Sequence, residues 1–218
     1  MIGKLIVIDG IDGAGKTTQI ELLKGYLASQ GLALQIEVIS FPRYGENLYA
    51  DLVTRYLEGE FGGIDKIDPH FVALAYAGDR ALAKPLIESW LGSGKLVIAN
   101  RYVSSSKAHL SANLPEDKKE EFMKWLDNLE YKTNGLPKPS LNILLKIDPK
   151  SGQQNVKGRR RADMHEKDLS HESKSAKIYL EIAEVEENWK ILDCMENKKL
   201  KSKEEIHKLL VEILGGIL

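Results

Sequence analysis

The sequence has little that would point to an oxidising compartment, a membrane or a strongly charged partner. Its single cysteine, Cys194, cannot form a disulfide within the chain, which suits a reducing compartment. Lys and Arg total 31 against 32 Asp and Glu, so the formal net charge of -1 gives no reason to expect binding to nucleic acid or membrane. No apolar run approaches the length of a membrane span, and the first residues read as a strand rather than a signal peptide. We therefore expect a soluble cytoplasmic protein.

Short apolar runs alternate along the chain with helical patterns. The runs that read as strands are 5–8, 32–39, 95–100, 141–147 and 189–193. Helices are expected at 16–30, 47–58 and 68–91, around 122–129 and 178–185, and after 202. Pro85 should kink or interrupt the third of these helices. Such alternation predicts a parallel sheet with helices on both faces, and 218 residues are enough for one domain spanning 1–218.

The strongest motif follows the first apolar run directly. It matches the pattern GxxxxGK[ST] without a gap, and Thr18 comes after it: Gly10, Ile11, Asp12, Gly13, Ala14, Gly15, Lys16 and Thr17. Glycines allow backbone N–H groups to converge on phosphate oxygens, and the next helix points its positive end at the same anion. Lys16 is placed to reach the phosphates, and Thr17 is placed to bind Mg²⁺. A glycine turn with a surface lysine is the plainer alternative, but the strand before it and the helix after it favour a nucleotide-binding P-loop.

Aromatic and basic residues follow the next two predicted strands. Phe41, Arg43 and Tyr44 come after the second strand, and Arg101 comes after the third. Because ligands gather at the carboxyl ends of parallel strands, these residues and the P-loop should face one crevice. Arg43 and Arg101 could clamp the phosphate of an acceptor there. The aromatic residues, with Tyr76, could form planar walls for a base.

A polar segment at 150–171 carries the densest positive charge of the chain, in Arg159, Arg160 and Arg161. Such a segment could close as a lid over a transferring phosphoryl group and neutralise its charge. Each of these features also has a plainer interpretation. Exposed arginines usually form a solvated surface, and aromatic residues at strand ends often only pack the core. Their joint occurrence at predicted strand ends after a P-loop favours the functional interpretation.

At this point the sequence resembles the thymidylate kinases, a family of nucleoside monophosphate kinases, from Gly3 to the C-terminal helix. The resemblance is carried by residues 10–18, 41–44, 79–80, 100–105 and 135–139. It is closest to the bacterial type, whose catalytic arginine lies in the lid, because Gly13 stands where the other type places an arginine.

The resemblance implies a P-loop NTPase fold with three α/β/α layers and a five-stranded parallel sheet, and ATP-dependent phosphorylation of dTMP to dTDP with Mg²⁺. Residues 10–18 would hold ATP, and Thr17 and Asp12 would lie at the metal. The implied catalytic residues are Lys16, Asp12, Arg101, Arg159, Arg160 and Arg161. The implied acceptor-binding residues are Phe41, Arg43, Tyr44, Tyr76, Arg80, Arg101, Ser105, Ser106, His109, Asp163 and His165. Among these, Phe41 and Tyr76 would pack on the thymine, and Arg80 would bind its carbonyl edge.

The chain also departs from the family pattern at several positions. Asn100 stands where the family has aspartate before Arg-Tyr, and His109 and His165 stand where tyrosines are common. These differences keep two alternatives open. One is a kinase for another pyrimidine nucleotide such as dUMP, and the other is a non-catalytic nucleotide-binding protein, for which Asn100 is the support.

The family forms homodimers through packed helices, so the resemblance also implies a homodimer. Ala73, Ala77 and Ala81 are spaced so that a partner helix could approach closely, although small residues also pack within a chain. Nucleotides and a second copy of the chain are the partners expected, with neither nucleic acid nor membrane among them.

Overall fold

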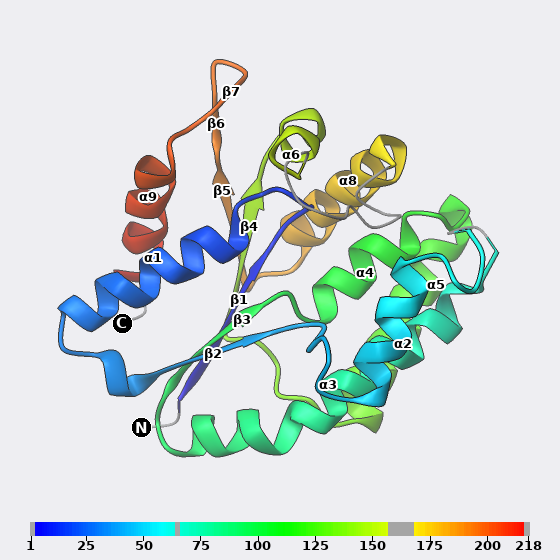
Figure 1. Cartoon of the computed structure of the whole chain (residues 1–218), viewed down its shortest axis with the longest axis horizontal. Coiled ribbons are helices and arrows are strands. Elements are labelled where there is room, and N and C mark those ends of the chain that lie inside the picture. The colour runs from blue at the N-terminus through cyan, green and yellow to red at the C-terminus, as the bar shows by residue number, and fades with distance from the viewer. Residues whose placement is uncertain (1–2, 64–65, 157–167, 216–218) are drawn as a thin grey trace.

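The computed structural model describes residues 3–63, 66–156 and 168–215, and a five-stranded sheet runs through the middle of the molecule (Figure 1). Its strands lie in the order β2-β3-β1-β4-β5, and every neighbouring pair is parallel. Their bounds are β1 Lys4–Asp9, β2 Ile36–Ser40, β3 Leu96–Asn100, β4 Leu141–Lys146 and β5 Trp189–Asp193. The predicted five-stranded parallel sheet is confirmed.

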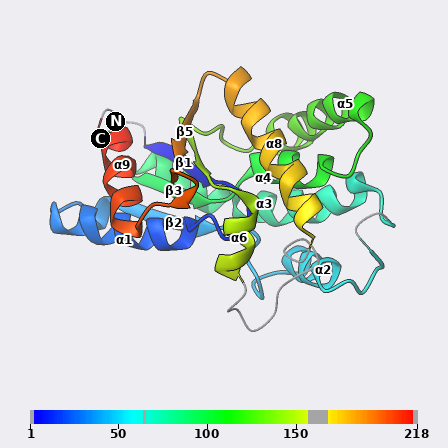
Figure 2. The ribbon, with the colours of Figure 1, turned by 90° about the horizontal axis from the view of Figure 1, so that it is seen from above.

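Helices occupy both faces of this sheet (Figure 2). The described α-helices are α1 Lys16–Ser29, α2 Leu48–Leu57, α3 Pro69–Gly92, α4 Val103–Ser111, α5 Glu116–Asp127, α6 Pro149–Val156, α8 Leu169–Val185 and α9 Lys203–Gly215. A 3-10 turn, Ala33–Gln35, precedes β2, and a π-helical turn, Asn128–Thr133, extends α5. Two short antiparallel strands, β6 Met195–Glu196 and β7 Lys199–Leu200, form a hairpin after β5. No described helix is long and apolar enough to cross a membrane.

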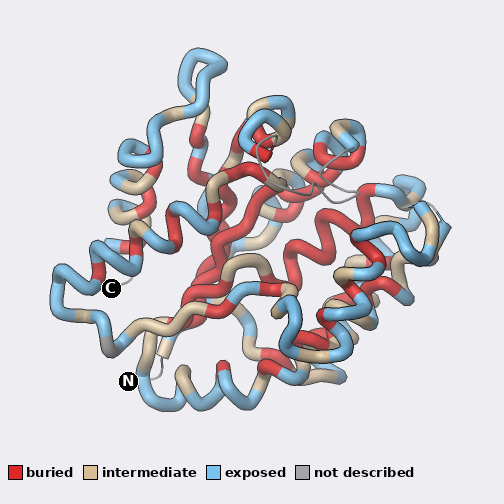
Figure 3. Tube along the Cα trace, in the orientation of Figure 1, coloured by how far each residue is buried: buried red, intermediate tan, exposed pale blue. Residues whose placement is uncertain are grey.

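The side chains of β1 alternate between two hydrophobic cores because successive residues of a strand point to opposite faces. Ile6 and Ile8 pack in the core that includes residues of α1, α8 and α9. Leu5 and Val7 pack in the core that includes residues of α2, α3 and α5. Figure 3 shows the inner strands β1, β3 and β4 as mostly buried, whereas the edge strands β2 and β5 include intermediate and exposed residues. This arrangement is the predicted three-layer fold.

Capping side chains fix several helix starts. Asp68 accepts a hydrogen bond from His70 N at 2.8 Å, with Pro69 in the first turn of α3. A capping box is also present before α9. Ser202 N donates to Glu205 Oε2 at 2.7 Å, and Glu205 N donates to Ser202 Oγ at 3.2 Å. These local signals were readable because they depend only on residues three or fewer positions apart.

Other expectations need correction. The strand expected over 32–39 begins only at Ile36, because the residues before it form the 3-10 turn. Helix α3 continues through Pro85, so the interruption considered there does not occur, while the kink stays a prediction. Val185, the last residue expected in the helix at 178–185, is 83% exposed. In the segment predicted as a lid, the first residues belong to α6 and the last to α8, while 157–167 lie outside the described residues.

Candidate active site

The ends of β1, β2 and β3 bring three predicted segments to one cleft. Parallel pairing sets Ile8 and Ser40 on either side of Asn100, so the loops after these strands emerge at the same edge. The cleft encloses about 520 Å³. Its lining residues are Asp12, Phe41, Pro42, Tyr44, Leu57, Tyr76, Arg80, Arg101, Ser105, Ser106, His109 and Leu110. The expected crevice therefore exists, and most of the predicted acceptor-binding residues line it.

The lysine of the P-loop is hydrogen-bonded to backbone carbonyl groups of the loop itself. Lys16 Nζ donates to the carbonyl oxygens of Gly10 and Ile11, both at 2.8 Å. Burial, followed by the nearby charge of Arg101, lowers the pKa of Lys16 to about 8. Gly13 adopts φ 76°, and a Cβ there would lie 2.1 Å from the Gly152 carbonyl oxygen, so only glycine allows α6 to pack this closely.

The start of α1 completes the loop. Gly15 lies before the helix in a left-handed conformation, with φ 84°, and hydrogen-bonds through its carbonyl to Gln19 N at 2.9 Å. Thr17 and Thr18 are exposed on the first turn of α1. The backbone N–H groups of this turn have no partner within the helix, and the helix dipole adds positive charge there. The loop thus offers donors and positive charge to an anion.

Arg101 is turned into the cleft by an unusual backbone conformation. Its φ is 66°, a left-handed value uncommon for a residue with a side chain. The guanidinium forms an ion pair with Asp12, and Nη1 lies 3.0 Å from both Ser105 Oγ and His109 Nε2. Although burial of Asp12 acts in the opposite direction, Arg101 and then Lys16 hold its pKa well below the usual range. Asp12 is therefore ionised beside two cations.

A buried carboxylate at the end of β1 supports this arrangement. Asp9 accepts hydrogen bonds from Ser104 Oγ at 2.7 Å, Ser105 Oγ at 2.8 Å and Tyr179 OH at 2.5 Å. Its Oδ1 lies 4.0 Å from Arg101 Nη1. Because these partners come from α4 and α8, Asp9 connects the P-loop strand to both helices.

The inner wall of the cleft holds a fully buried ion pair. Arg80 on α3 is 1% exposed and pairs with Glu130, which is 0% exposed. Arg80 also donates to Ser106 Oγ at 2.8 Å and to the carbonyl oxygen of Tyr102 at 3.2 Å. These contacts and the two to Glu130 occupy four of the five N–H groups of the guanidinium. The remaining N–H, on Nη1, has no hydrogen-bond partner among the described residues.

The expected aromatic walls are present in different degrees. Phe41 is 4% exposed and packs 5.8 Å from the Tyr102 ring, while Tyr44 is 58% exposed at the cleft mouth. Tyr76 lies beneath Arg80, with the guanidinium carbon 5.9 Å from its ring centroid. Phe41, Tyr44 and Tyr76 all line the cleft, and Tyr44 is the most exposed of the three.

Arg43 lies apart from the other predicted phosphate ligands. It is not among the residues that line the cleft. Its Nε donates to Asp79 Oδ1 at 2.9 Å, and Nη2 donates to the Asp79 carbonyl oxygen at 3.0 Å. A third contact, 3.3 Å long, joins Nη1 to Glu46. The contacts of this guanidinium are thus mainly to Asp79.

Helix α8 contributes residues that the sequence analysis missed. Glu172 Oε2 accepts a hydrogen bond from Asp12 N at 3.1 Å, and so ties α8 to the P-loop. Burial, with the nearby Asp12 charge, raises the pKa of Glu172 to about 7. A usable signal was present, because extending the apolar stripe of Ile178 and Ile182 back along the helix leads to Ser175 and then to Glu172. The predicted residues Arg159, Arg160, Arg161, Asp163 and His165 lie outside the described residues.

The fold and the site together define a P-loop nucleotide-binding protein of the α/β class. A sequence profile for thymidylate kinase matches residues 8–206. The chain is 32% identical over 185 residues to thymidylate kinase from Mycobacterium tuberculosis, covering 82% of this chain and 85% of that protein. It is 30% identical over 218 residues to a probable thymidylate kinase from Thermococcus kodakarensis, covering 98% of each chain.

A solved structure of thymidylate kinase from Candida albicans shares the fold, with a TM-score of 0.75 and 23% identity over 99% of this chain and 92% of that chain. The chain belongs to the thymidylate kinase family.

Proposed function

We propose that this protein transfers the γ-phosphoryl group of ATP to dTMP, giving dTDP and ADP, a step in dTTP biosynthesis. The observation that carries the proposal is that Asp12, a P-loop residue, also lines the cleft that contains Phe41 and Tyr76. A nucleotide triphosphate on the loop and a nucleotide base in the cleft would therefore lie side by side. Family membership supports this pairing of donor and acceptor.

In this reaction the protein would act mainly by positioning and charge. Phosphoryl transfer requires little covalent chemistry from the enzyme, because the transition state is stabilised by donors and cations around the phosphoryl oxygens. Lys16 and the loop N–H groups would hold the ATP phosphates. Arg101 would hold the acceptor phosphate, exchanging part of its contact with Asp12 for the incoming anion. Arg159, Arg160 and Arg161 would supply further charge from the lid segment.

The donor groups near the loop fit a magnesium ion. Mg²⁺ prefers oxygen ligands, and Asp12 supplies an ionised carboxylate while Thr17 supplies an exposed hydroxyl. Asp12 and Thr17 would hold the ion, which would supply positive charge to the phosphate groups. Asn100 Oδ1 is buried without a hydrogen-bond partner among the described residues, and it offers a neutral oxygen at the end of β3. We therefore expect Mg²⁺ to be needed despite the missing aspartate.

The cleft supports a pyrimidine acceptor. One N–H of Arg80 could donate to a carbonyl group of the base. Its other N–H groups donate to protein atoms, including Ser106 Oγ and Glu130, and these contacts hold the inner wall of the cleft in place. His109 and Ser105 line the same cleft nearer Arg101. Asp163 and His165 would add contacts from the segment after α6.

We also propose that the protein forms a homodimer in the cytoplasm. Exposed apolar side chains lie on α2 and α3, which pack against each other, and exposed apolar surface of this kind favours association. They are Leu48, Tyr49, Leu52, Phe71, Leu74, Leu82 and Leu86. Ala73 and Ala77 are not part of this surface, because they are 0% and 2% exposed, whereas Ala81 is partly exposed. Sedimentation analysis of the purified protein would test the dimer, and a monomer at micromolar concentration would contradict it.

A coupled ADP-release assay with a panel of nucleoside monophosphates tests the main proposal. We expect the highest kcat/KM with dTMP, Mg²⁺-dependent turnover and dTDP as the product. Preference for dUMP would point to the other pyrimidine kinase. Absence of ADP release with every acceptor, in protein that still binds ATP, would favour the non-catalytic alternative.

A further inference from the structure

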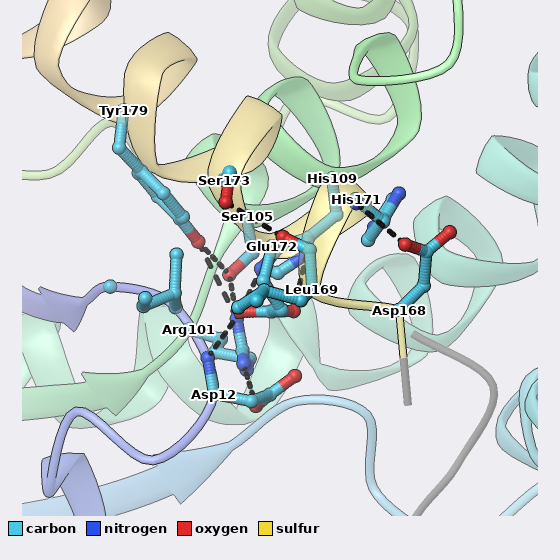
Figure 4. Close-up of polar contacts among 12 residues, drawn as sticks. Asp12, Arg101, Ser105, His109, Asp168, Leu169, His171, Glu172, Ser173 and Tyr179 are labelled. Atoms are coloured by element: carbon cyan, nitrogen blue, oxygen red, sulfur yellow. Dashed lines mark hydrogen bonds and ion pairs between the residues drawn. The ribbon is translucent and has the colours of Figure 1, made fainter. Parts of the chain in front are cut away.

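Two histidines and a glutamate meet at the wall of the cleft. His109 on α4 and His171 and Glu172 on α8 are all buried, and each offers one possible metal-ligand atom within 4.8 Å of the others. Figure 4 shows the three side chains drawn together beside Arg101. The two imidazole rings lie 5.7 Å apart with their planes tilted by 31°. We propose that these residues bind a divalent transition-metal cation of the zinc class.

The ligand types separate this site from a magnesium site. Imidazole nitrogen suits zinc and similar transition metals, whereas Mg²⁺ prefers oxygen ligands. Two histidines and one glutamate form a known class of zinc site, with a fourth position left for water or a substrate oxygen. The site is therefore chemically distinct from the oxygen groups of Asp12 and Thr17.

Glu172 has one oxygen that the protein leaves unsatisfied. Its Oε2 accepts from Asp12 N at 3.1 Å, but its Oε1 has no hydrogen-bond partner among the described residues. The residue is only 4% exposed, and a buried carboxylate oxygen without a partner is costly. This Oε1 lies 4.0 Å from His109 Nδ1, so a cation between the two would satisfy the oxygen.

His171 is held in an orientation suited to metal binding. Its Nδ1 lies 3.3 Å from Asn113 Oδ1. Because an amide oxygen only accepts, Nδ1 carries the proton and Nε2 carries the lone pair. A ligand histidine commonly donates its other ring N–H to such a partner, which fixes the ring and its tautomer. Asn113 therefore has the position of a supporting residue.

Arg101 competes with the cation for His109. Arg101 Nη1 lies 3.0 Å from His109 Nε2, and since arginine only donates, the proton of the neutral ring lies on Nδ1. Binding of a cation at Nδ1 requires that this proton move to Nε2 and that Arg101 turn away. The same Nη1 already lies 3.0 Å from Ser105 Oγ, so it has a second acceptor. A bound cation would consequently displace Arg101 and inhibit any reaction that needs it.

The charges around the cluster favour a cation. Lys16 and Arg101 interact electrostatically with three carboxylates, Asp9, Asp12 and Glu172. When all five groups are ionised they leave one negative charge in excess. Asp168 and Lys174, which also act on His171, offset each other in formal charge. Among the described residues, the immediate surroundings of Glu172 therefore tolerate additional positive charge.

The proposal is tested on the full chain, stripped with a chelator and free of nucleotide. Zn²⁺ is titrated in competition with a chromophoric chelator, and one ion per chain is expected to bind. His171→Gln and Glu172→Gln should each raise the Kd at least as much as loss of a supporting residue, about 10–100-fold. His207→Gln, the same change on α9, is the matched control and should leave the Kd unchanged. A thermal scan of each variant reports whether it is folded.

Should a ligand variant fail to fold, Asn113→Ala takes its place and should weaken binding about 10-fold. The proposal is overturned by a wild type that binds no Zn²⁺, by ligand variants that bind it as tightly as the wild type, or by a control weakened to the same degree. Because the measurement uses neither nucleotide nor turnover, its failure leaves the proposed kinase function standing. If the kinase proposal is wrong, the result of the Zn²⁺ titration is likewise unaffected.

Discussion

Two arginines line the same cleft and differ in whether their partners can be exchanged. Arg80 and Glu130 are 1% and 0% exposed, and both are surrounded by protein. Arg101 and Asp12 are 16% and 22% exposed, and they face the opening toward the P-loop. A buried pair loses much if one partner is removed, whereas a pair near water can trade one anion for another. The inner pair therefore gives the cleft its shape, and the outer pair is available to a phosphate.

Replacing the P-loop lysine should produce the largest effect. Lys16→Ala removes a cation from the exchangeable end of the cleft, and loss of one such stabilising donor costs about 10²–10³-fold in kcat. A coupled ADP-release assay with dTMP measures the loss. The melting temperature should change little, because among the described residues the polar contacts of Lys16 are local, to carbonyl groups of its own loop and to Asp12. Near-normal turnover would remove the P-loop from the mechanism.

Replacing Arg80 should mainly lower stability, and replacing Arg101 should mainly lower catalytic activity. Arg80→Ala leaves Glu130 buried without its partner and should lower the free energy of unfolding by about 3–5 kcal/mol. Arg101→Ala should have a smaller effect on stability and a larger one on kcat/KM, because its partners are nearer water. Denaturant unfolding and steady-state kinetics of both variants provide the comparison. Equal stability losses would show that the inner and outer pairs do not differ.

A double variant sharpens this result. Arg80→Met together with Glu130→Leu removes both buried charges, and most of the stability lost by Arg80→Ala should return. Acceptor binding should not return with it, since no donor then remains at that wall. Recovered stability with unchanged dTMP affinity would show that the pair is needed only for folding.

Asn100→Asp should have a modest effect. The residue lies at the end of β3, and its Oδ1 is buried without a partner among the described residues. Aspartate there would add charge near Arg101 and strengthen the outer end of the cleft. We expect a tighter Mg²⁺ dependence with similar or higher kcat, measured by Mg²⁺ titration of dTDP formation. Identical titration curves would show that the aspartate is not needed here for metal binding, and an inactive wild type beside an active variant would favour the non-catalytic alternative.

The smallest effect should come from a site remote from both pairs. Ser202→Ala removes the capping box before α9 and should cost about 1 kcal/mol of stability. Because this helix start contacts neither arginine pair, kcat and KM should stay at wild-type values. If KM changed as much as in Arg101→Ala, the kinetic differences between the arginine variants would reflect a general loss of stability rather than loss of a contact in the cleft.

The parts of the molecule that the sequence predicted are those encoded by neighbouring residues. The P-loop is contiguous, and the strands appear as short apolar runs, so their positions and the sheet could be predicted. Partnerships between distant residues could not. Glu130 supports Arg80 from 50 positions away, and Glu172 reaches Asp12 across 160 positions.

The functional residues that the sequence did not predict are mainly polar residues on a buried helix face. Glu172 and Tyr179 could not be predicted from the stripe of isoleucines alone, although they lie on the same buried face of α8. Arg43 shows a related limit, because the sequence predicted a role for it but not its partner. Its place after a strand predicted an open phosphate ligand, but the structure gives it Asp79, a residue on a different element. Position along the chain predicts which edge of the sheet a residue reaches, but not which partner it finds there.

The contact between Lys16 and its own loop has a consequence for the affinity of phosphate binding. Two of the three N–H groups of the ammonium donate to the carbonyl oxygens of Gly10 and Ile11, so a phosphate can receive more than one hydrogen bond from Lys16 only if a carbonyl gives one up. The loop carbonyls therefore compete with the anion for the lysine. ATP should bind more weakly than it would to a loop whose lysine had already left them.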